Sequence, residues 1–314
     1  MSKVSVIGAG NVGATAVYYI AEKNLADIVM VDVVEGIPQS KGLDFLHAAP
    51  LREYNVRIFG TNNIKEIAGS DVIVFTAGVA RKPGMDRMDL LKINAKIAQE
   101  ASAAIATYAP DAVVVVVTNP LDVICMVVLK ETGFEPARVV GQAGVLDSTR
   151  FRYFIAEELG LWTGDVTAMV LGGHGDSMVP LRRYTSVSGF PIDELLDEEG
   201  VERLVERTRR GGAEVINYLK TGSAFYAPAA STVKMVESII KDERRLLPAS
   251  VYLNGDYGYK NIFLGVPVFL GAGGVRKILE LPLSEDEKSA LDNSARAVEE
   301  GVETLESLYE QKIL

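Results

Sequence analysis

The residues best suited to acid–base chemistry in this 314-residue sequence centre on one of its two histidines. His174 lies in the glycine-flanked run G-G-H-G-D-S, which follows the strand-like run V-T-A-M-V-L. Glycines on both sides keep the backbone open, as a histidine exposed at the end of a strand requires. Because an imidazole changes its charge near neutral pH, we expect His174 to donate and accept a proton. The alternative is a histidine that packs structurally, which is our interpretation of His47.

An acid and a base three residues apart open a predicted helix in the run D-S-T-R-F-R. By themselves, Asp147 and Arg150 fit the charged start of a helix, with Asp147 near the N-cap. In the functional interpretation, Asp147 accepts a hydrogen bond from His174 and favours its protonated form. Arg150 then binds a carboxylate through its two-pronged guanidinium.

A basic loop with a Pro-Gly pair contains Arg81 and Arg87 and follows a predicted strand. Open α/β sheets bind ligands at the carboxyl ends of their strands, where this loop belongs. Because the formal net charge is −10, these arginines reverse the local field and favour a small acidic substrate. The alternative is a solvated charged loop. Asn119 ends another strand at the same edge, where its side chain bonds the cofactor, the substrate or only a turn.

The scaffold for these side chains begins with the motif G-x-G-x-x-G at Gly8, Gly10 and Gly13. It follows a strand-like run and opens an apolar-periodic helix, the setting in which such a motif binds the pyrophosphate of a dinucleotide. A second strand ends at Asp32, 19 residues beyond Gly13, where an acid can accept hydrogen bonds from both ribose hydroxyls. Two valines and no basic residue follow Asp32, which favours NAD over NADP. The alternative is a glycine turn without a ligand.

Short β-branched runs alternate with helical segments through the first half of the chain, at residues 4–7, 28–31, 56–59, 72–75 and 113–117. This alternation predicts an α/β fold with a Rossmann-type doubly wound parallel sheet. From about residue 147 the pattern changes to long helices (198–219 and 225–241), strands around 250–252, 262–264 and 266–269, and a final helix over 284–309. We therefore predict an NAD-binding domain over 1–146 and an α+β substrate-binding domain over 147–314.

Composition excludes several other classes of protein. The excess of acidic residues argues against a nucleic-acid surface, and the apolar runs are far shorter than the ~20 residues that a membrane span needs. Two histidines and one cysteine leave little material for a metal site. The single cysteine also fits a reducing compartment. We expect a cytoplasmic protein with no metal, no nucleic acid and no membrane partner.

The segments GAGNVG, TAGVARKPGMDR, VTNPLD, GVLDSTRFR and GGHGDSMVP together carry a family likeness. In this order and spacing they resemble the lactate/malate dehydrogenase family, and within it the lactate-dehydrogenase-like malate dehydrogenases. The resemblance covers essentially the whole chain, and the motifs are specific jointly although each is weak alone. It implies the reversible oxidation of (S)-malate to oxaloacetate, a step of the tricarboxylic acid cycle.

The resemblance also implies a role for each candidate side chain. His174 corresponds to the family's proton donor and acceptor, and Asp147 to its aspartate partner. Arg150 corresponds to the arginine that binds the substrate's carboxylate, and Arg87 to the loop arginine that polarises the reacting carbonyl. The loop position of Arg81 holds glutamine in lactate dehydrogenases and arginine in malate dehydrogenases, so that Arg81 implies a dicarboxylate substrate.

Further contacts follow from the same resemblance. Asn119 corresponds to an asparagine that contacts the substrate and the nicotinamide region, and Ser223 falls where many members have a threonine against the substrate. NAD is the implied cofactor. The residues expected to bind it are Gly8, Gly10, Asn11, Val12, Gly13, Asp32, Thr76, Ala77, Gly78, Asn94, Val117 and Asn119.

Three alternatives to malate oxidation remain open at this point. They are an L-lactate dehydrogenase, against which Arg81 argues, a catalytically silent NAD-binding scaffold, and a nicotinamide oxidoreductase of unrelated chemistry. The family resemblance also implies a homo-oligomer, which we expect to be a tetramer, with a dimer as the alternative.

Overall fold

A nine-stranded sheet runs through the centre of the molecule in the computed structural model. The structure describes residues 2–79 and 87–309, except for the side chains of 87, 308 and 309. The strand order of the sheet is β14-β13-β12-β6-β5-β4-β1-β2-β3. The strands are β1 (Lys3–Ile7), β2 (Asp27–Val31), β3 (Ile58–Thr61), β4 (Val72–Phe75), β5 (Val113–Val116), β6 (Val139–Gly141), β12 (Arg245–Asn254), β13 (Lys260–Gly271) and β14 (Gly274–Ile278). Six neighbouring strands pair in parallel, in the order β6, β5, β4, β1, β2 and β3. The sheet continues from β6 through β12, β13 and β14, which pair antiparallel.

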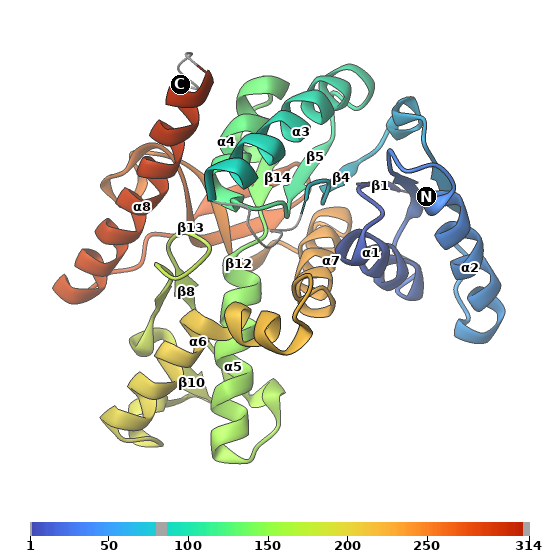
Figure 1. The fold of residues 1–314 in the computed structure, drawn as a ribbon. Helices are drawn as coiled ribbons and strands as arrows, with labels where there is room; N and C mark the ends of the chain where they lie inside the picture. The colour runs from blue at the N-terminus through green and yellow to red at the C-terminus, as the bar shows by residue number, and fades with distance from the viewer. Residues whose placement is uncertain (1, 80–86, 310–314) are drawn as a thin grey trace.

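Both faces of the parallel strands are covered by helices, which explains why these strands are continuously apolar. Because successive side chains point to opposite faces, Val72 and Val74 of β4 enter one core whereas Ile73 and Phe75 enter the other. Helices α1 (Asn11–Glu22) and α7 (Tyr226–Ile240) pack on the first face, and α3 (Arg87–Tyr108) and α4 (Leu121–Thr132) pack on the second (Figure 1). The predicted Rossmann-type sheet is confirmed.

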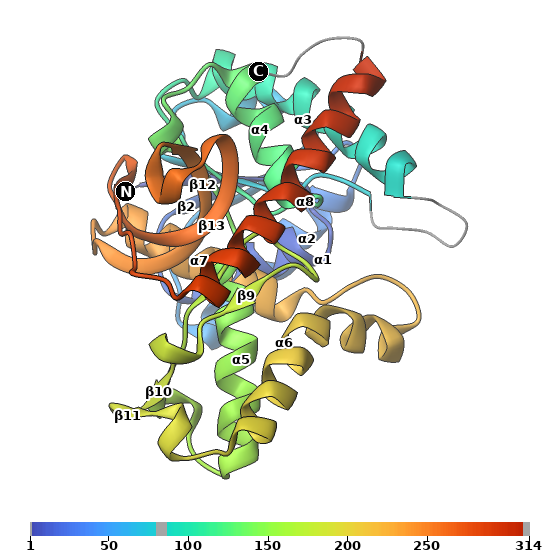
Figure 2. The same ribbon diagram turned by 90° about the vertical axis from the view of Figure 1, so that its left-hand side faces the viewer.

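A smaller lobe with its own apolar core lies beyond the large sheet (Figure 2). Its main helices are α5 (Gly144–Leu159) and α6 (Glu198–Leu219), which pack on short strands. These strands are β7 (Val166–Thr167), β8 (Val170–Leu171), β9 (Val179–Pro180), β10 (Ser186–Val187) and β11 (Phe190–Pro191). The remaining helices are α2 (Ile37–Arg52), which packs on β3, and α8 (Glu285–Tyr309), which contacts β13 and α4.

Two strand predictions differ from the structure in detail. The run over 166–171 is not one strand, since β7 pairs with β10 and β8 pairs with β9 in a separate sheet. The strands expected near 250 and 266 form one long hairpin, β12 and β13, and β12 pairs with β6 at the edge of the parallel strands. Part of the second half therefore completes the sheet of the first half. The division into domains at residue 146 stays a prediction.

An ion cluster on the first face ties α1 to α7. Glu237 of α7 is buried, and its carboxylate lies 3.1 Å from Lys23 at the C-cap of α1, 3.5 Å from Lys234 and 2.9 Å from Lys241. Burial acts to raise the pKa of Glu237, but its hydrogen bonds to lysines and their charges outweigh burial and lower the pKa to about 2. The carboxylate is therefore charged near neutral pH.

Within residues 2–79 and 87–309, no helix is both long enough and apolar enough to cross a membrane. The same residues contain no group of three or more His, Cys, Asp or Glu side chains placed to hold a metal ion. Cys125 is buried in the core between α4 and the sheet, where burial raises the pKa of its thiol well above the usual range. A thiol in this state is an inert core residue.

Candidate active site

The turn between β1 and α1 has a shape that only glycine allows at two of its positions. Gly8 has a φ of +108°, and a Cβ atom on Gly13 would lie 1.9 Å from the Gly8 carbonyl oxygen. Gly10 is different, because it is exposed and a Cβ there would meet nothing within 4 Å. Among the described residues, no side chain caps α1, whose N-cap is Gly10. This geometry fits the pyrophosphate of NAD at the start of α1.

Asp32 directly follows β2 and is held beside this turn. Its Oδ2 accepts a hydrogen bond from the Ala9 N–H at 2.7 Å, and its Oδ1 accepts one from the Val34 N–H at 2.9 Å. Asn62 donates to the Asp32 carbonyl at 2.7 Å and so fixes the backbone as well. Since a carboxylate has about four acceptor sites, both oxygens can still accept from ribose hydroxyls.

The ends of β4 and β5 bring further predicted cofactor residues to the same edge. Thr76 donates through Oγ1 to the Gly8 carbonyl at 3.0 Å, which joins the end of β4 to the glycine turn. Thr118 donates to the Ala77 carbonyl at 2.8 Å. A Cβ on Gly78 would lie 2.7 Å from the Thr118 methyl group, so the close approach of the two segments requires a glycine there.

Asn94 of α3 has its side chain engaged by the backbone. Its Oδ1 accepts from the Val79 N–H at 2.8 Å and its Nδ2 donates to the Asn119 carbonyl at 2.7 Å. Asn94 is buried, whereas the Asn119 side chain is exposed and Val117 is half-buried at the end of β5. We infer that Asn94 orients the segments around the cofactor site, while Asn119 is free to meet a ligand.

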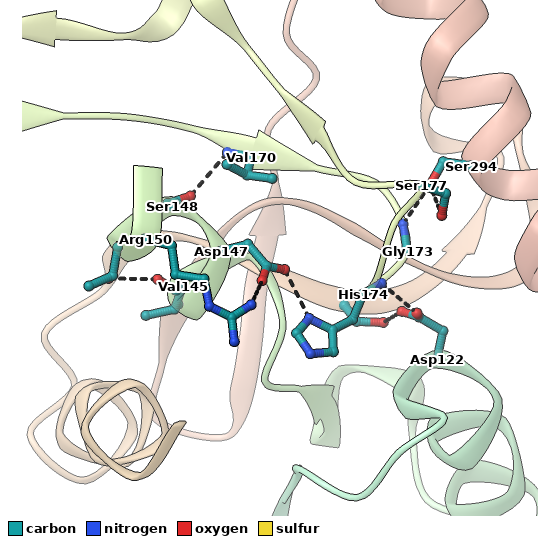
Figure 3. A network of polar contacts seen from close by, with 12 residues as sticks. Asp122, Val145, Asp147, Ser148, Arg150, Val170, Gly173, His174, Ser177 and Ser294 are labelled. Carbon is teal, nitrogen blue, oxygen red and sulfur yellow. Dashed lines mark hydrogen bonds and ion pairs between the residues drawn. The ribbon is translucent and has the colours of Figure 1, made fainter. Parts of the chain in front are cut away.

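The candidate proton-transfer group is a chain of three side chains from two elements (Figure 3). Asp147, in the first turn of α5, lies between the other two. The His174 Nδ1–H donates to Asp147 Oδ2 at 2.9 Å, and Arg150 Nη1 donates to Asp147 Oδ1 at 3.1 Å. The exposed fractions of the side chains are 15% for His174, 16% for Arg150 and 2% for Asp147. With Nδ1 bonded to Asp147, Nε2 of His174 is the nitrogen left to exchange a proton.

The charge of this histidine is set by opposing influences. Burial lowers the pKa of His174, whereas the charge of Asp147 and the hydrogen bond to it raise the pKa. The charge of Arg150 lowers the pKa of His174, and the charge of Asp122 raises it. The net effect is a pKa above the ordinary value of 6.5. The protonated form of His174 is therefore well populated near neutral pH.

The segment that carries His174 is held by residues that the sequence analysis did not single out. Asp122, in the first turn of α4, accepts from the His174 N–H at 2.9 Å and from the Ser250 hydroxyl at 2.6 Å. Ser294 of α8 accepts from the Gly173 N–H at 2.8 Å (Figure 3). Burial raises the pKa of Asp122, although the hydrogen bonds from the Ser250 hydroxyl and the His174 N–H oppose that rise. An acid within the apolar run L-D-V-I-C-M-V-V was the one sequence signal for this buried contact.

Arg150 lies against two adjacent glycines in the middle of α6. A Cβ on Gly211 would lie 3.1 Å from Arg150 Cδ, and one on Gly212 would lie 3.7 Å from Nη2. Glycine inside a helix is destabilising by roughly 0.5–1 kcal/mol relative to alanine, so its presence twice in succession calls for a cause. At Gly211 the cause is the crowding that a Cβ would bring to the Arg150 side chain, whereas a Cβ on Gly212 would keep an ordinary van der Waals distance.

Three predicted substrate residues are not brought into this group by the described structure. Arg81 lies outside the described residues. Arg87 begins α3, but its side chain is not described. Ser223 is exposed in the segment between α6 and α7 and has no recorded hydrogen bond to a described residue. The roles of these three residues stay predictions.

Comparisons with known proteins identify relatives of this chain. Two family models match the sequence, described as "lactate/malate dehydrogenase, NAD binding domain" over residues 2–141 and "lactate/malate dehydrogenase, alpha/beta C-terminal domain" over residues 144–308. A malate dehydrogenase of Methanosarcina mazei is 55% identical over 98% of this chain and 100% of its own length.

Solved structures give the same result for the fold. The apo form of the malate dehydrogenase from Picrophilus torridus has a TM-score of 0.95 and 45% identity, covering 98% of each chain. The lactate dehydrogenase from Cryptosporidium parvum, in complex with lactic acid and nicotinamide adenine dinucleotide, has a TM-score of 0.94 and 41% identity, covering 97% of this chain and 98% of that one.

Proposed function

The chain belongs to the lactate/malate dehydrogenase family, and we propose that it catalyses the reversible NAD-dependent oxidation of (S)-malate to oxaloacetate. One observation carries the proposal in the structure: His174 and Arg150, both half-buried, are joined by hydrogen bonds through buried Asp147, and the chain is anchored to the start of α4 at the carboxyl edge of an NAD-binding sheet. Relatives that match 94–98% of the chain and bear the name malate dehydrogenase support the choice of substrate.

The proton steps follow from the hydrogen bonds of His174. In malate oxidation, neutral His174 accepts the hydroxyl proton of the substrate at Nε2 and becomes an imidazolium. Asp147 stabilises that charge and keeps the other proton on Nδ1, so that Nε2 always faces the substrate. The bound dinucleotide would supply the redox chemistry, with NAD as the hydride acceptor in this direction and NADH as the hydride donor in the other. In oxaloacetate reduction, protonated His174 returns the proton to the forming hydroxyl.

Substrate binding is assigned to the arginines. Arg150, held by Asp147 and given room by Gly211 of α6, binds the carboxylate next to the reacting carbon through its fork of N–H groups. We further propose that Arg87 stabilises the negative charge that develops on the carbonyl oxygen. Arg81 pairs with the second carboxylate, and Asn119 and Ser223 complete the contacts.

NAD fits the residues at the glycine turn better than NADP does. The open space over Gly10 and the uncapped start of α1 suit the pyrophosphate, and Asp32 suits two free ribose hydroxyls. A phosphate on one of these hydroxyls would bring like charges together at Asp32. The other residues proposed to bind NAD lie nearby. They are Thr76, Ala77 and Gly78 after β4, Val117 and Asn119 after β5, and Asn94 of α3.

The runner-up is lactate oxidation, since a lactate dehydrogenase shares the fold closely. Arg81 decides between the two, because an unpaired buried arginine facing the methyl group of pyruvate would cost several kcal/mol on general grounds. NADH oxidation should be compared with oxaloacetate and pyruvate, and for each with NADPH in place of NADH. We expect oxaloacetate with NADH to be preferred by orders of magnitude. A preference for pyruvate would overturn the substrate assignment.

The assignment of Arg81 has its own test. Arg81→Gln should weaken oxaloacetate use by at least about tenfold, since one charged pair is lost, and leave NADH binding unchanged. An unchanged KM and kcat for oxaloacetate would contradict the role of Arg81.

We also propose a cytoplasmic homotetramer, with a dimer as the alternative. The family resemblance supports the oligomer, and a single buried cysteine fits a reducing compartment. Light scattering after size-exclusion chromatography distinguishes four, two and one copies, and a monomer at micromolar concentration would contradict the proposal.

A further inference from the structure

Lys41 of α2 holds the glycine-rich turn together with Asp32. Its Nζ donates to the Ala9 carbonyl at 2.6 Å, while the Ala9 N–H donates to Asp32 at 2.7 Å. Ala9 is buried between Gly8 and Gly10, so both of its backbone polar groups are fixed by charged side chains of opposite sign. Lys41 itself is half-buried.

A positive charge is more than this carbonyl needs. Ordering a long lysine side chain costs rotamer entropy, and a neutral donor could also satisfy one carbonyl oxygen. Among the hydrogen bonds of residues 2–79 and 87–309, Lys41 is the one basic side chain that reaches the turn from Gly8 to Gly13. The charge therefore points to a ligand that is itself charged.

The need for a positive charge at the turn arises from Asp32. Its carboxylate suits the ribose hydroxyls, but it stands beside the place where a pyrophosphate must bind, and like charges repel. Lys41, bonded to the same residue as Asp32, offsets that repulsion. Two of the three ammonium N–H groups have no recorded partner among the described residues and remain able to donate.

We propose that Lys41 is a positioning residue for the dinucleotide, which holds the Ala9 carbonyl so that the turn is formed before NAD arrives and which balances the charge of Asp32. This inference rests on the proposed function only in taking NAD as the ligand. Its test titrates NADH in the absence of any ketoacid, so it does not depend on whether oxaloacetate or pyruvate is the substrate.

The experiment compares Lys41→Met, which keeps the unbranched stem without the charge, with Lys41→Arg, which keeps the charge. Lys41→Gln is a second neutral variant with a polar end, in case Lys41→Met does not fold. The matched control is Lys277→Met, because Lys277 is exposed on β14 at the opposite edge of the sheet. NADH affinity is measured by calorimetry, and the KM values for NADH and oxaloacetate by steady-state kinetics.

We expect the neutral variants to bind NADH about tenfold or more weakly, since a hydrogen bond from a charged group is lost. The KM for oxaloacetate at saturating NADH should not change, Lys41→Arg should recover most of the affinity, and Lys277→Met should match the parent. NADH affinity equal to the parent's in either neutral variant, or an equal loss in Lys277→Met, would overturn the proposal. Failure of both neutral variants to fold would also overturn it, because Lys41 would then be a structural residue.

Discussion

Replacing Asp147 with asparagine tests whether the charge of this carboxylate, and not only its position, controls His174. Asparagine has nearly the same shape but cannot accept from both neighbours, because one of its two polar ends is an N–H donor. In the parent, both carboxylate oxygens accept, one from His174 and one from Arg150. The variant therefore turns an N–H group toward one of two cationic partners.

The size of the effect can be worked from the contacts. The charge of Asp147 and its hydrogen bond oppose the burial that lowers the pKa of His174, and in Asp147→Asn burial and Arg150 remain to lower it. A hydrogen bond to a charged group contributes about 1.5–3 kcal/mol. At about 1.4 kcal/mol per factor of ten, the loss of this contribution lowers the pKa of His174 and so depletes its protonated form. At pH 7 the protonated fraction then drops by up to ~100-fold.

The assay is the pH dependence of kcat/KM for oxaloacetate reduction, which requires protonated His174 and so declines as the pH rises through the pKa of His174. We expect the midpoint of this decline to move to lower pH in Asp147→Asn, and the loss of activity to shrink as the pH is lowered. Malate oxidation at high pH, which starts from neutral His174, should suffer less. Asp111→Asn, at an exposed position, is the control. A lower kcat with an unmoved midpoint would refute the electrostatic argument and leave Asp147 with orientation alone.

Three further predictions follow from other contacts. Asp122→Asn should lower kcat by about tenfold and leave NADH affinity unchanged, since one buried donor near His174 loses its acceptor; parent-like kcat would contradict this. Gly211→Ala should raise the KM for oxaloacetate several-fold by displacing Arg150, while the melting temperature holds or rises; an unchanged KM would show that Arg150 has room to spare. Glu237→Gln should lower the free energy of unfolding in urea by about 1–3 kcal/mol at pH 7. Because the pKa of Glu237 is depressed from 4.5 to about 2, that difference should fade as the pH falls through this range, and a constant difference would argue against it.

The parts of the fold that the sequence predicts are those with a strong local signal. β4 and β5 are continuous β-branched runs between helices, and the structure has them within one residue of the predicted bounds. β6 has three residues, too few to show a pattern. The long hairpin of β12 and β13 was recognised only as short pieces, because proline and glycine interrupt the run that tertiary pairing makes continuous.

In the candidate active site, too, the features with a local sequence signal could be predicted and the long-range contacts could not. The glycine turn and Asp32 are close in sequence and follow a known spacing, so their proximity could be predicted. The pairing of His174 with Asp147 was expected from complementary chemistry and a family resemblance. By contrast, the contacts of Asp122 with His174 and Ser250 span 52 and 128 residues, and nothing local to a buried acid indicates which distant donors it will meet.

The hydrogen bonds that hold the His174 segment also set the order in which a growing chain becomes an enzyme. A nascent chain that has emerged from the ribosome as far as residue 200 already contains His174, Asp147 and the complete glycine turn. It still lacks Ser250, which donates to Asp122, and Ser294, which accepts from the Gly173 N–H. The dinucleotide-binding strands can therefore assemble during translation, whereas the last of the hydrogen bonds on the histidine segment, from the Gly173 N–H to Ser294, forms only when the last helix is made.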